Sequence, residues 1–589
     1  MEELTKSTLE SGGSQAPHIT SAIPPAAPTI PSTLHASLMA RLDRLGDAKE
    51  AAQVGATIGR QFSFELLAAV TGVAEHELAN ALDRLTAAGL VFRQGTIPHA
   101  SFLFKHALVR DAAYGTLLRH RRQNLHLRVA RSLEEKFPDL TAAQPALLAH
   151  HYAAGDSRDK AIRYWREAGE RAVHSAANHE AIEHLQRALS FIREKEETTD
   201  RWRAELSILS MLSPALMGVY GWSAAEVGQA VERAAEVARQ LESSADLAPS
   251  IANLWHFNVA RGRLDRADEI SSDLYRVAHE LHDPEIMLQA HHATWPVRWL
   301  RGCFTDANRE IEAGIALYDE HRHQHHRYVY LGHDPAVCAL GIGAIVHWAL
   351  GYPARAIGLD QQATTLARRL QHVPSLAQAL SLGCELRKAH GDVPALTLTA
   401  TELLALSEEN GLPQFRVTAL MFLGWAQANS GEPALGTARL EKELVTWRQM
   451  GAKFHLSRSM CLLAEGYLSA QLNTEGLERV AEALAIACET GELWYVAPLH
   501  QVRAELLLQA QAPVEAVEAD LQAAIQVARQ QGARCWELRA ATRLAHLWRD
   551  QGKRIEAHDL LAPVYGWFTE CFDTPDLKEA KLLLEQLKA

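Results

Sequence analysis

Apolar residues in the second half of the chain recur at helical spacing. One uninterrupted stripe ends just before Gly491, and a second stripe repeats it one period later and ends before Gly532. The first consists of Leu477, Val480, Ala481, Leu484, Ala485 and Cys488, and the second of Val514, Val517, Leu521, Ala524, Ile525 and Ala528. Such stripes predict amphipathic helices that bury one face against neighbours.

Glycines separate these helical segments at regular intervals. Gly411, Gly451, Gly491 and Gly532 lie 40, 40 and 41 residues apart, and further glycines divide the intervals or continue the series: Gly351, Gly391, Gly431 and Gly552. Glycine suits the position just after a helix because it adopts the left-handed conformation without steric cost. The pattern predicts about ten helix hairpins between Gly155 and Phe572, with a period of about 40 residues, as in a solenoid.

The first helix pair shows the spacing of a known repeat. Trp165 and Gly169, followed by Ala181, Leu185 and Ala188, fit the tetratricopeptide pattern, with Ala168 and Ala172 at the positions usually held by Leu and Tyr. Small residues at these offsets allow two helices to approach closely. The expected fold class is therefore all-α, with a tetratricopeptide-type α-solenoid as its largest part.

The N-terminal quarter has a different pattern. Helical stretches near 47–57, 63–71 and 75–88 precede two short extended runs, 90–93 and 101–104, which together indicate a winged-helix-like domain. The expected organisation has five parts: a short helix at 1–10, a Pro- and Ser-rich linker at 11–33, the winged-helix-like domain at 34–118, connecting helices at 119–154 and the solenoid at 155–589.

Composition narrows the functional classes. Hydrophobic residues make up 48% of the chain and the net charge is −12, so nothing attracts the whole chain to nucleic acid or to an anionic membrane. The helix at 75–87 carries Glu75, Glu77 and Asp83 against Arg84, which is a poor surface for DNA phosphates. The seven cysteines show no CxxC spacing and favour reduced thiols in a cytoplasmic protein. The longest apolar run, 336–346, is too short to span a bilayer.

Several segments together resemble a bacterial family of multidomain signalling proteins. They include FLFKHALVRDAAYGTLL at 102–118 and GHDPAVCALG at 332–341, and the others lie at 1–12, 31–67, 147–156, 214–227 and 561–581. Members of this family combine a class III adenylate or guanylate cyclase domain, a signal-transduction ATPase of the STAND type, a winged helix and tetratricopeptide repeats. The resemblance implies that this chain corresponds to the C-terminal region, with residues 1–10 as the closing helix of the ATPase module.

The chain lacks the motifs for the family's chemistry. A P-loop requires G-x-x-x-x-G-K-[ST], whose backbone amides hold the phosphates, whereas the Gly552-Lys553 pair has neither the upstream glycine nor the following hydroxyl residue. A cyclase domain with metal-binding carboxylates is not recognisable either. We therefore expect no enzymatic activity and no cofactor. The alternatives are a C-terminal fragment of a cyclase or ATP-binding protein whose catalytic domains lie upstream or are lost, and a transcription regulator.

A few residues are candidates for a functional site. The resemblance implies that His106 occupies the place of a nucleotide-sensing histidine, although a helix-capping or buried structural role is the simpler interpretation. Five histidines stand close together at His321, His323, His325, His326 and His333, but no Cys or carboxylate pair keeps metal-site spacing beside them, so no metal is expected.

Four tryptophans fall in the first helices of repeats and are candidates for contact with a partner. They are Trp255, Trp299, Trp348 and Trp425. The favoured hypothesis is a regulatory region that binds a protein, peptide or small ligand on the concave face of the solenoid, with no contact to nucleic acid or membrane. The sequence does not indicate an oligomeric state.

Overall fold

The computed structural model describes residues 32–175, 177–241, 244–330 and 332–588. The predicted short helix at 1–10 and nearly all of the linker at 11–33 lie outside these residues. Two compact units are present. Among the described residues, unit 1 comprises 32–143 and His150–Ser157, and unit 2 comprises Gln144–Ala149 and the described residues from Arg158 to 588.

Unit 1 combines short helices with a small antiparallel sheet. Its elements are α1 (Ser32–Asp43), α2 (Asp47–Ile58), β1 (Gln61–Ser63), α3 (Phe64–Thr71), α4 (Glu75–Ala87), β2 (Val91–Gln94), β3 (Ser101–Phe104), α5 (Ala107–Gly115), α6 (Arg119–Lys136) and α7 (Pro138–Ala143). The helix α8 (Pro145–Ala154) begins in unit 2 and ends in unit 1. The sheet has the order β1-β3-β2. Helices and strands lie close to the expected positions, and assignment to the winged-helix class stays a prediction.

The strand β1 was not predicted from the sequence. It has three residues, of which only Phe62 is buried, so it is too short for an alternating pattern to be recognised. Phe62 stacks on Phe102 of β3 with ring centroids 5.8 Å apart and also contacts Phe104. Gly55 of α2 faces the Phe62 ring, where a Cβ atom would approach to 2.7 Å. The aromatic cluster therefore fixes the short strand against α2.

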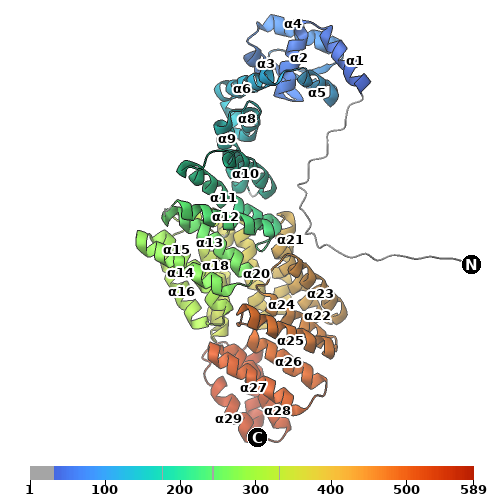
Figure 1. The fold of residues 1–589 in the computed structure, drawn as a ribbon. Coiled ribbons are helices and arrows are strands. Elements are labelled where there is room, and N and C mark those ends of the chain that lie inside the picture. The colour runs from blue at the N-terminus through green and yellow to red at the C-terminus, as the bar shows by residue number, and fades with distance from the viewer. Residues whose placement is uncertain (1–31, 176, 242–243, 331, 589) are drawn as a thin grey trace, which may run out of the picture. The chain divides into compact units, whose positions relative to one another are not determined.

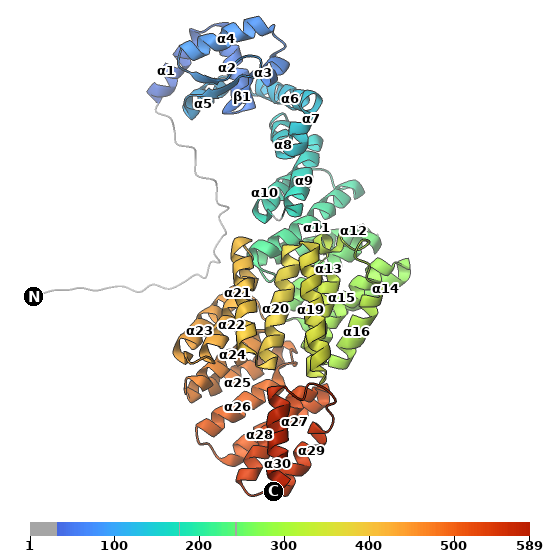
Figure 2. The ribbon, with the colours of Figure 1, turned by 180° about the vertical axis from the view of Figure 1, so that it is seen from behind.

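Unit 2 is an α-solenoid of antiparallel helix hairpins (Figures 1 and 2). Its first hairpins contain α9 (Arg158–His174), α10 (Asn178–Arg193), α11 (Thr199–Tyr220), α12 (Ala225–Gln240), α13 (Ser244–Ala260), α14 (Leu264–Leu281), α15 (Pro284–Leu300) and α16 (Phe304–Leu317). The short α17 (His326–Val329) follows. The later elements are α18 (Pro335–Ala349), α19 (Pro353–Leu370), α20 (Val373–His390), α21 (Val393–Glu409), α22 (Pro413–Ala428), α23 (Pro433–Gln449), α24 (Leu456–Ser469), α25 (Asn473–Thr490), α26 (Val496–Gln509), α27 (Val514–Gln531), α28 (Arg534–Asp550), α29 (Arg554–Tyr565) and α30 (Pro575–Lys588).

The turns between paired helices use a left-handed residue. Gly391 and Gly431 have φ angles of 72° and 97°, and Gln471 and Gln511 take the equivalent place with φ angles of 60° and 55°. Left-handed geometry is rare for residues other than glycine and asparagine. The turn therefore persists where the glycine series is interrupted, because the packed hairpin imposes the conformation.

Distant parts of unit 2 are joined by hydrogen bonds between turns of the solenoid. The backbone amide of Lys453 donates to the carbonyl of Ala260 at 3.0 Å, and that of Trp494 donates to Leu300 at 3.1 Å. In addition, α18 packs against α28. Unit 2 is thus wound into a superhelix whose later hairpins contact its earlier ones, which brings the inner helices around shared cavities.

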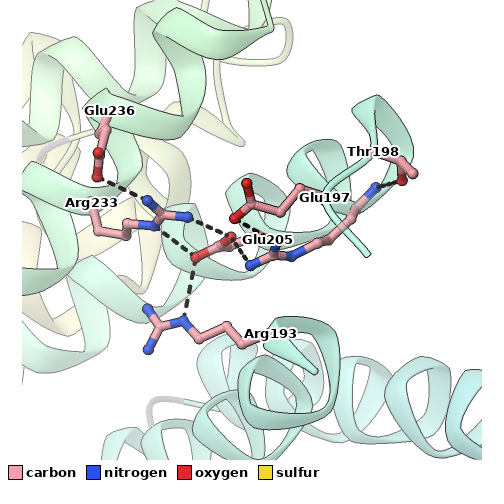
Figure 3. A network of polar contacts seen from close by, with 7 residues as sticks. Arg193, Glu197, Thr198, Glu205, Arg233 and Glu236 are labelled. Carbon is pink, nitrogen blue, oxygen red and sulfur yellow. Dashed lines mark hydrogen bonds and ion pairs between the residues drawn. The ribbon is translucent and has the colours of Figure 1, made fainter. Parts of the chain in front are cut away.

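A buried ion network joins three helices near the start of unit 2 (Figure 3). The Glu205 side chain of α11 is fully buried and accepts hydrogen bonds from Arg233 of α12 at 2.9 Å and from Arg193 of α10 at 3.3 Å. Burial alone would raise the pKa of Glu205, but the two guanidinium groups outweigh it and hold the pKa below its usual value. The carboxylate therefore stays ionised and links α10, α11 and α12.

The long apolar run at 336–346 lies in α18 and is almost entirely buried, as expected for a repeat helix. Within the described part of the chain, none of the helices combines the length and apolar character that crossing a bilayer requires.

Candidate functional site

The main candidate site is a cavity of about 310 Å³ inside unit 2, here called the inner cavity. The helices α18, α20, α22, α24, α26, α28 and α30 contribute to its wall. Its aromatic residues are Trp348, Trp425, Trp494, Tyr495 and Trp536, and its charged residues are Glu385, Lys388, Glu465, Glu505, Arg539, Arg543, Asp576 and Glu579. An aromatic wall with a few fixed polar groups is typical of a small-ligand site.

Lys388 occupies the deep end of the inner cavity. Its ammonium group donates to Glu465 at 2.8 Å and to the Tyr495 hydroxyl at 2.9 Å, and it lies over the rings of Trp425 and Tyr495 at 5.5 and 5.4 Å. The Trp425 indole also donates to Glu465. Burial alone would lower the pKa of Lys388, but Glu465 and its other neighbours raise it above the usual value. A charged pair is thus permanently held between aromatic rings.

The charged pairs become more exposed toward the mouth of the cavity. Arg539 donates to Asp576 at 2.8 Å and lies 5.0 Å from the Trp348 ring centroid. Arg543 bridges Glu505 and Glu579, each at 3.2 Å. Side-chain exposure is 9% at Lys388 but 50% at Arg543. Because exposed ion pairs are weak, the pair at the mouth is the one that a ligand can replace most easily.

The Glu505 carboxyl is the unusual acid of this cavity. Burial raises its pKa, and the neighbouring charge of Arg543 only partly offsets that effect. A second positive charge beside Glu505 would favour its ionised form. The mouth therefore suits a cationic group next to Glu505 and an anionic group next to Arg543.

The inner cavity shows no arrangement for covalent catalysis in the described residues. Apart from the Tyr495 hydroxyl, which accepts from Lys388, the hydroxyl side chains are those of Ser469 and Thr542, which donate to backbone carbonyls of their own helices at 3.1 and 2.8 Å. Neither hydroxyl is bonded to a histidine or carboxylate that would activate it. The chemistry that the geometry offers is recognition by charge and aromatic stacking.

The structure separates the four tryptophans that the sequence singled out. Trp348 of α18 and Trp425 of α22 line the inner cavity. Trp299 of α15 lines a smaller cavity of about 50 Å³ and contacts Trp494 at 4.7 Å between centroids. Trp255 of α13 is buried beside His256. A partner contact by any of the four stays a prediction.

A second cavity of about 310 Å³, here called the loop-end cavity, lies at the helix ends of several hairpins. Its wall includes Trp222, Tyr328, His333, His372 and Gln414, and Arg327 is the only Lys, Arg, Asp or Glu among its described lining residues. Burial and the charge of Arg327 lower the pKa of His372 to about 3, so this imidazole is neutral. The loop-end cavity therefore offers neutral donors and one positive charge.

The remaining candidate histidines differ in burial and in their contacts. His106 is exposed at the N-cap of α5 and makes no side-chain capping hydrogen bond, so its proposed relation to a nucleotide stays a prediction. His321 and His325 are exposed, whereas His323, His326 and His333 are buried. His326 accepts a hydrogen bond from Gln289 at 2.7 Å.

Sequence reasoning did not identify Lys388, Glu465, Glu505 or Arg539. Each is a charged residue among apolar positions on the inner face of its helix, which was the available signal. A charged residue in that position indicates a buried partner, but the partners lie between 37 and 107 residues away. The spacing therefore could not reveal the site.

No protein-family model matches the chain. An uncharacterized protein of Rhizobium meliloti (strain 1021) is 29% identical over 520 residues, which covers 87% of this chain and 50% of that protein. The chain thus spans about half the length of this relative.

Solved structures resemble the chain only at low sequence identity. The APC/C hetero-tetramer Cut9-Hcn1 has 12% identity and a TM-score of 0.44, and covers 89% of this chain and 92% of its own. A STAND protein with a tetratricopeptide repeat sensor from Pyrococcus horikoshii has 11% identity and a TM-score of 0.29, with coverage of 93% and 65%. A Rap protein complexed with competence and sporulation factor has 9% identity and a TM-score of 0.37, with coverage of 72% and 99%. Likeness at this level carries no functional inference.

Proposed function

We propose that this chain is a non-catalytic regulatory region that binds a protein segment, peptide or small ligand inside its tetratricopeptide-type solenoid. The observation that carries the proposal is the inner cavity, in which five aromatic residues and alternating charged pairs from seven helices meet around about 310 Å³. Such a volume accommodates a small ligand or the end of a peptide.

The ligand that fits best carries both an ammonium or guanidinium group and a carboxylate. Glu505 and Glu579 lie on either side of Arg543 at the mouth. A zwitterionic ligand can therefore replace the ion pair between Arg543 and Glu579 with two new pairs, one to Arg543 and one to Glu505. The carboxylate replaces Glu579 beside Arg543, and the cation stabilises the ionised form of Glu505. Lys388 and Glu465 stay paired at the deep end, where separation of the two charges would be costly.

The wider context of the proposal is control of a signalling protein. The resemblance to cyclase and STAND proteins supports a role in which ligand capture by the repeats regulates an ATPase or cyclase part through a winged-helix-like unit. The missing P-loop supports a chain that is not itself an enzyme. The dispersed cysteines support a cytoplasmic protein, and the net charge supports a protein without nucleic-acid or membrane contacts.

A ligand panel with cavity variants tests the proposal. The full chain is screened by thermal shift and then calorimetry against free amino acids and di- and tripeptides, alongside forms with acetylated amino and amidated carboxyl ends. We expect a subset of the free forms to bind and the blocked forms to lose most of their affinity. Arg543→Gln and Glu505→Gln should abolish this binding.

The matched control is Arg448→Gln. Arg448 forms a comparable surface pair with Glu482 at 2.5 Å, on α23 and α25 outside the cavity, and its loss should leave binding unchanged. Binding that survives both cavity substitutions would place the ligand elsewhere and refute the assigned site. A panel without any binder would contradict the zwitterion as ligand class.

A further inference from the structure

Two histidines and a cysteine from separate segments meet in the interior of unit 2. His292 lies on α15, His333 lies one residue before the N-cap of α18, and Cys338 lies in the first turn of α18. Their ligand atoms all lie within 4.8 Å of one another, and all three residues are buried. The two imidazole Nε2 atoms face each other at 3.2 Å.

The spacing matches a metal centre. Metal–nitrogen bonds of about 2.0–2.1 Å place two nitrogen ligands of a tetrahedral ion about 3.4 Å apart, close to the separation found here. Imidazole and thiolate together suit Zn²⁺ and Cu⁺, and disfavour Mg²⁺ and Ca²⁺, which prefer oxygen. The protein offers three such ligands, so a fourth position on Zn²⁺ would be open to water, whereas Cu⁺ is satisfied by three.

A second layer of side chains already orients His292. The Gln289 carbonyl oxygen lies 3.2 Å from His292 Nδ1, and the Gln289 amide donates to His326 Nδ1 at 2.7 Å. The amide therefore has a fixed orientation, in which its oxygen accepts the Nδ1 proton of His292. That tautomer directs the lone pair of His292 Nε2 toward His333 and Cys338. Hydrogen bonds of this kind fix ligating histidines in metal sites.

The turn that carries His333 and Cys338 is also held in place. Asp334 caps α18 by accepting from the amides of Ala336 and Val337 at 3.0 and 3.2 Å. Its own amide donates to the Ser375 hydroxyl at 2.9 Å. Trp295 stacks on His292 with ring centroids 4.9 Å apart. The three ligand atoms are thus positioned by groups that do not themselves belong to the site.

From this geometry we propose that His292, His333 and Cys338 form a structural binding site for a d¹⁰ cation, either Zn²⁺ or Cu⁺. On binding, a bond forms from the metal to each Nε2 and to the sulfur, the Cys338 thiol releases its proton to solvent, and the one proton of the neutral His333 ring resides on Nδ1. No metal was expected from the sequence, because only the histidine-rich segment around His333 was considered. The second histidine ligand, His292, lies on α15, outside that segment.

Metal binding has a defined proton balance. Coordination requires neutral imidazole rings and a thiolate, so the metal must displace a proton from the Cys338 thiol, and affinity should rise with pH. The competing interpretation is a metal-free hydrogen bond between the two imidazoles.

Cobalt titration distinguishes the two interpretations. The full chain, purified with reduced thiols, is titrated with Co²⁺ both in its native state and during refolding from urea, so that burial cannot hide the site. We expect one equivalent to bind, with thiolate-to-cobalt charge-transfer absorption and the strong visible bands of low-coordinate cobalt. Displacement of this spectrum by Zn²⁺ identifies zinc as the ion, and displacement by Cu⁺ alone identifies copper.

Variants assign the ligands. Cys338→Ser should remove the charge-transfer band, whereas Cys384→Ser, which removes an equally buried thiol of α20, should retain it. Gln289→Leu should lower the affinity about 10- to 100-fold without removing a ligand. Absence of the band in both native and refolded protein would overturn the proposal. So would a band that persists in Cys338→Ser, since it would show that another cysteine binds the metal.

Discussion

Gly436 of α23 is the position where the solenoid should tolerate a side chain least. A Cβ atom there would lie 2.7 Å from the Ala428 Cα atom, and closer still to the Ala428 nitrogen and the Gly424 carbonyl oxygen of α22. All three are backbone atoms, so no rotamer change can relieve the clash. Ordinary contact between carbon atoms is about 3.5–4.0 Å, so α22 and α23 would have to separate by about 1 Å.

Gly436→Ala should therefore destabilise the chain by about 2 kcal/mol. Overpacking costs about 1–3 kcal/mol, and the better helix propensity of alanine returns at most about 1 kcal/mol. Gly358→Ala in α19 is the matched control, because a Cβ atom there meets nothing within 4 Å. It should stabilise the chain by about 0.5–1 kcal/mol.

The measurement is urea unfolding followed by far-UV circular dichroism, with hydrogen exchange to locate the effect. Gly436→Ala should move the midpoint down and speed exchange in α22 and α23, whereas Gly358→Ala should move it up. If both substitutions shift the midpoint in the same direction, or if exchange in α22 and α23 is unchanged, the close backbone contact between these helices is wrong.

Three further predictions concern the helix network, the first hairpin and nucleotides. Glu205→Gln should lower the free energy of unfolding by about 3 kcal/mol, because it leaves arginines around a buried neutral group. Glu183→Gln, at an exposed position, should change it by less than about 0.5 kcal/mol. Equal effects of the two substitutions in urea unfolding would refute the network. The folded-state pKa of Glu205 lies below its unfolded value of about 4.3. The stabilisation by its carboxylate is therefore present above about pH 4.3 and is lost as pH falls through the folded pKa. The difference in free energy of unfolding between wild type and Glu205→Gln should accordingly shrink in acid. Gly169→Leu should cost about 1–3 kcal/mol, since a Cβ atom already approaches Leu185 to 2.5 Å, and unchanged stability would contradict the hairpin packing. Calorimetry with ATP or ADP and Mg²⁺ should show no heat beyond dilution, and a micromolar site would contradict the inference from the missing P-loop.

Local pattern predicted the helices of this chain but not the sites between them. The helix at 75–87 and the buried run at 336–346 follow from apolar periodicity and turn residues close in sequence. The strand β1 was missed because its three residues are fixed by Phe102 and Phe104, about 40 positions later. The lesson is that periodicity reports which face of an element is buried, not which distant element covers it.

The two sites illustrate the same limit on a larger scale. Lys388 meets Tyr495 from 107 residues away, and His292 meets His333 from 41 residues away. The separation of 107 residues is not a multiple of the period of about 40 residues, and the separation of 41 residues is close to one period but does not by itself show that these two side chains meet. Winding of the superhelix sets these pairs, and winding depends on the summed packing angles of many hairpins.

Contacts between turns of the superhelix also change how unit 2 should fold. In an open solenoid each repeat touches only its neighbours, so repeats can melt one after another from either end. Here Lys453 is bonded to Ala260 and Trp494 to Leu300, which ties segments nearly 200 residues apart. Closing such long loops makes assembly slow and dependent on both ends of the chain. Removal of the last hairpins should therefore speed hydrogen exchange at the amides of α13 and α15 as well as at those beside the cut. Unit 2 would then unfold cooperatively and not one repeat at a time.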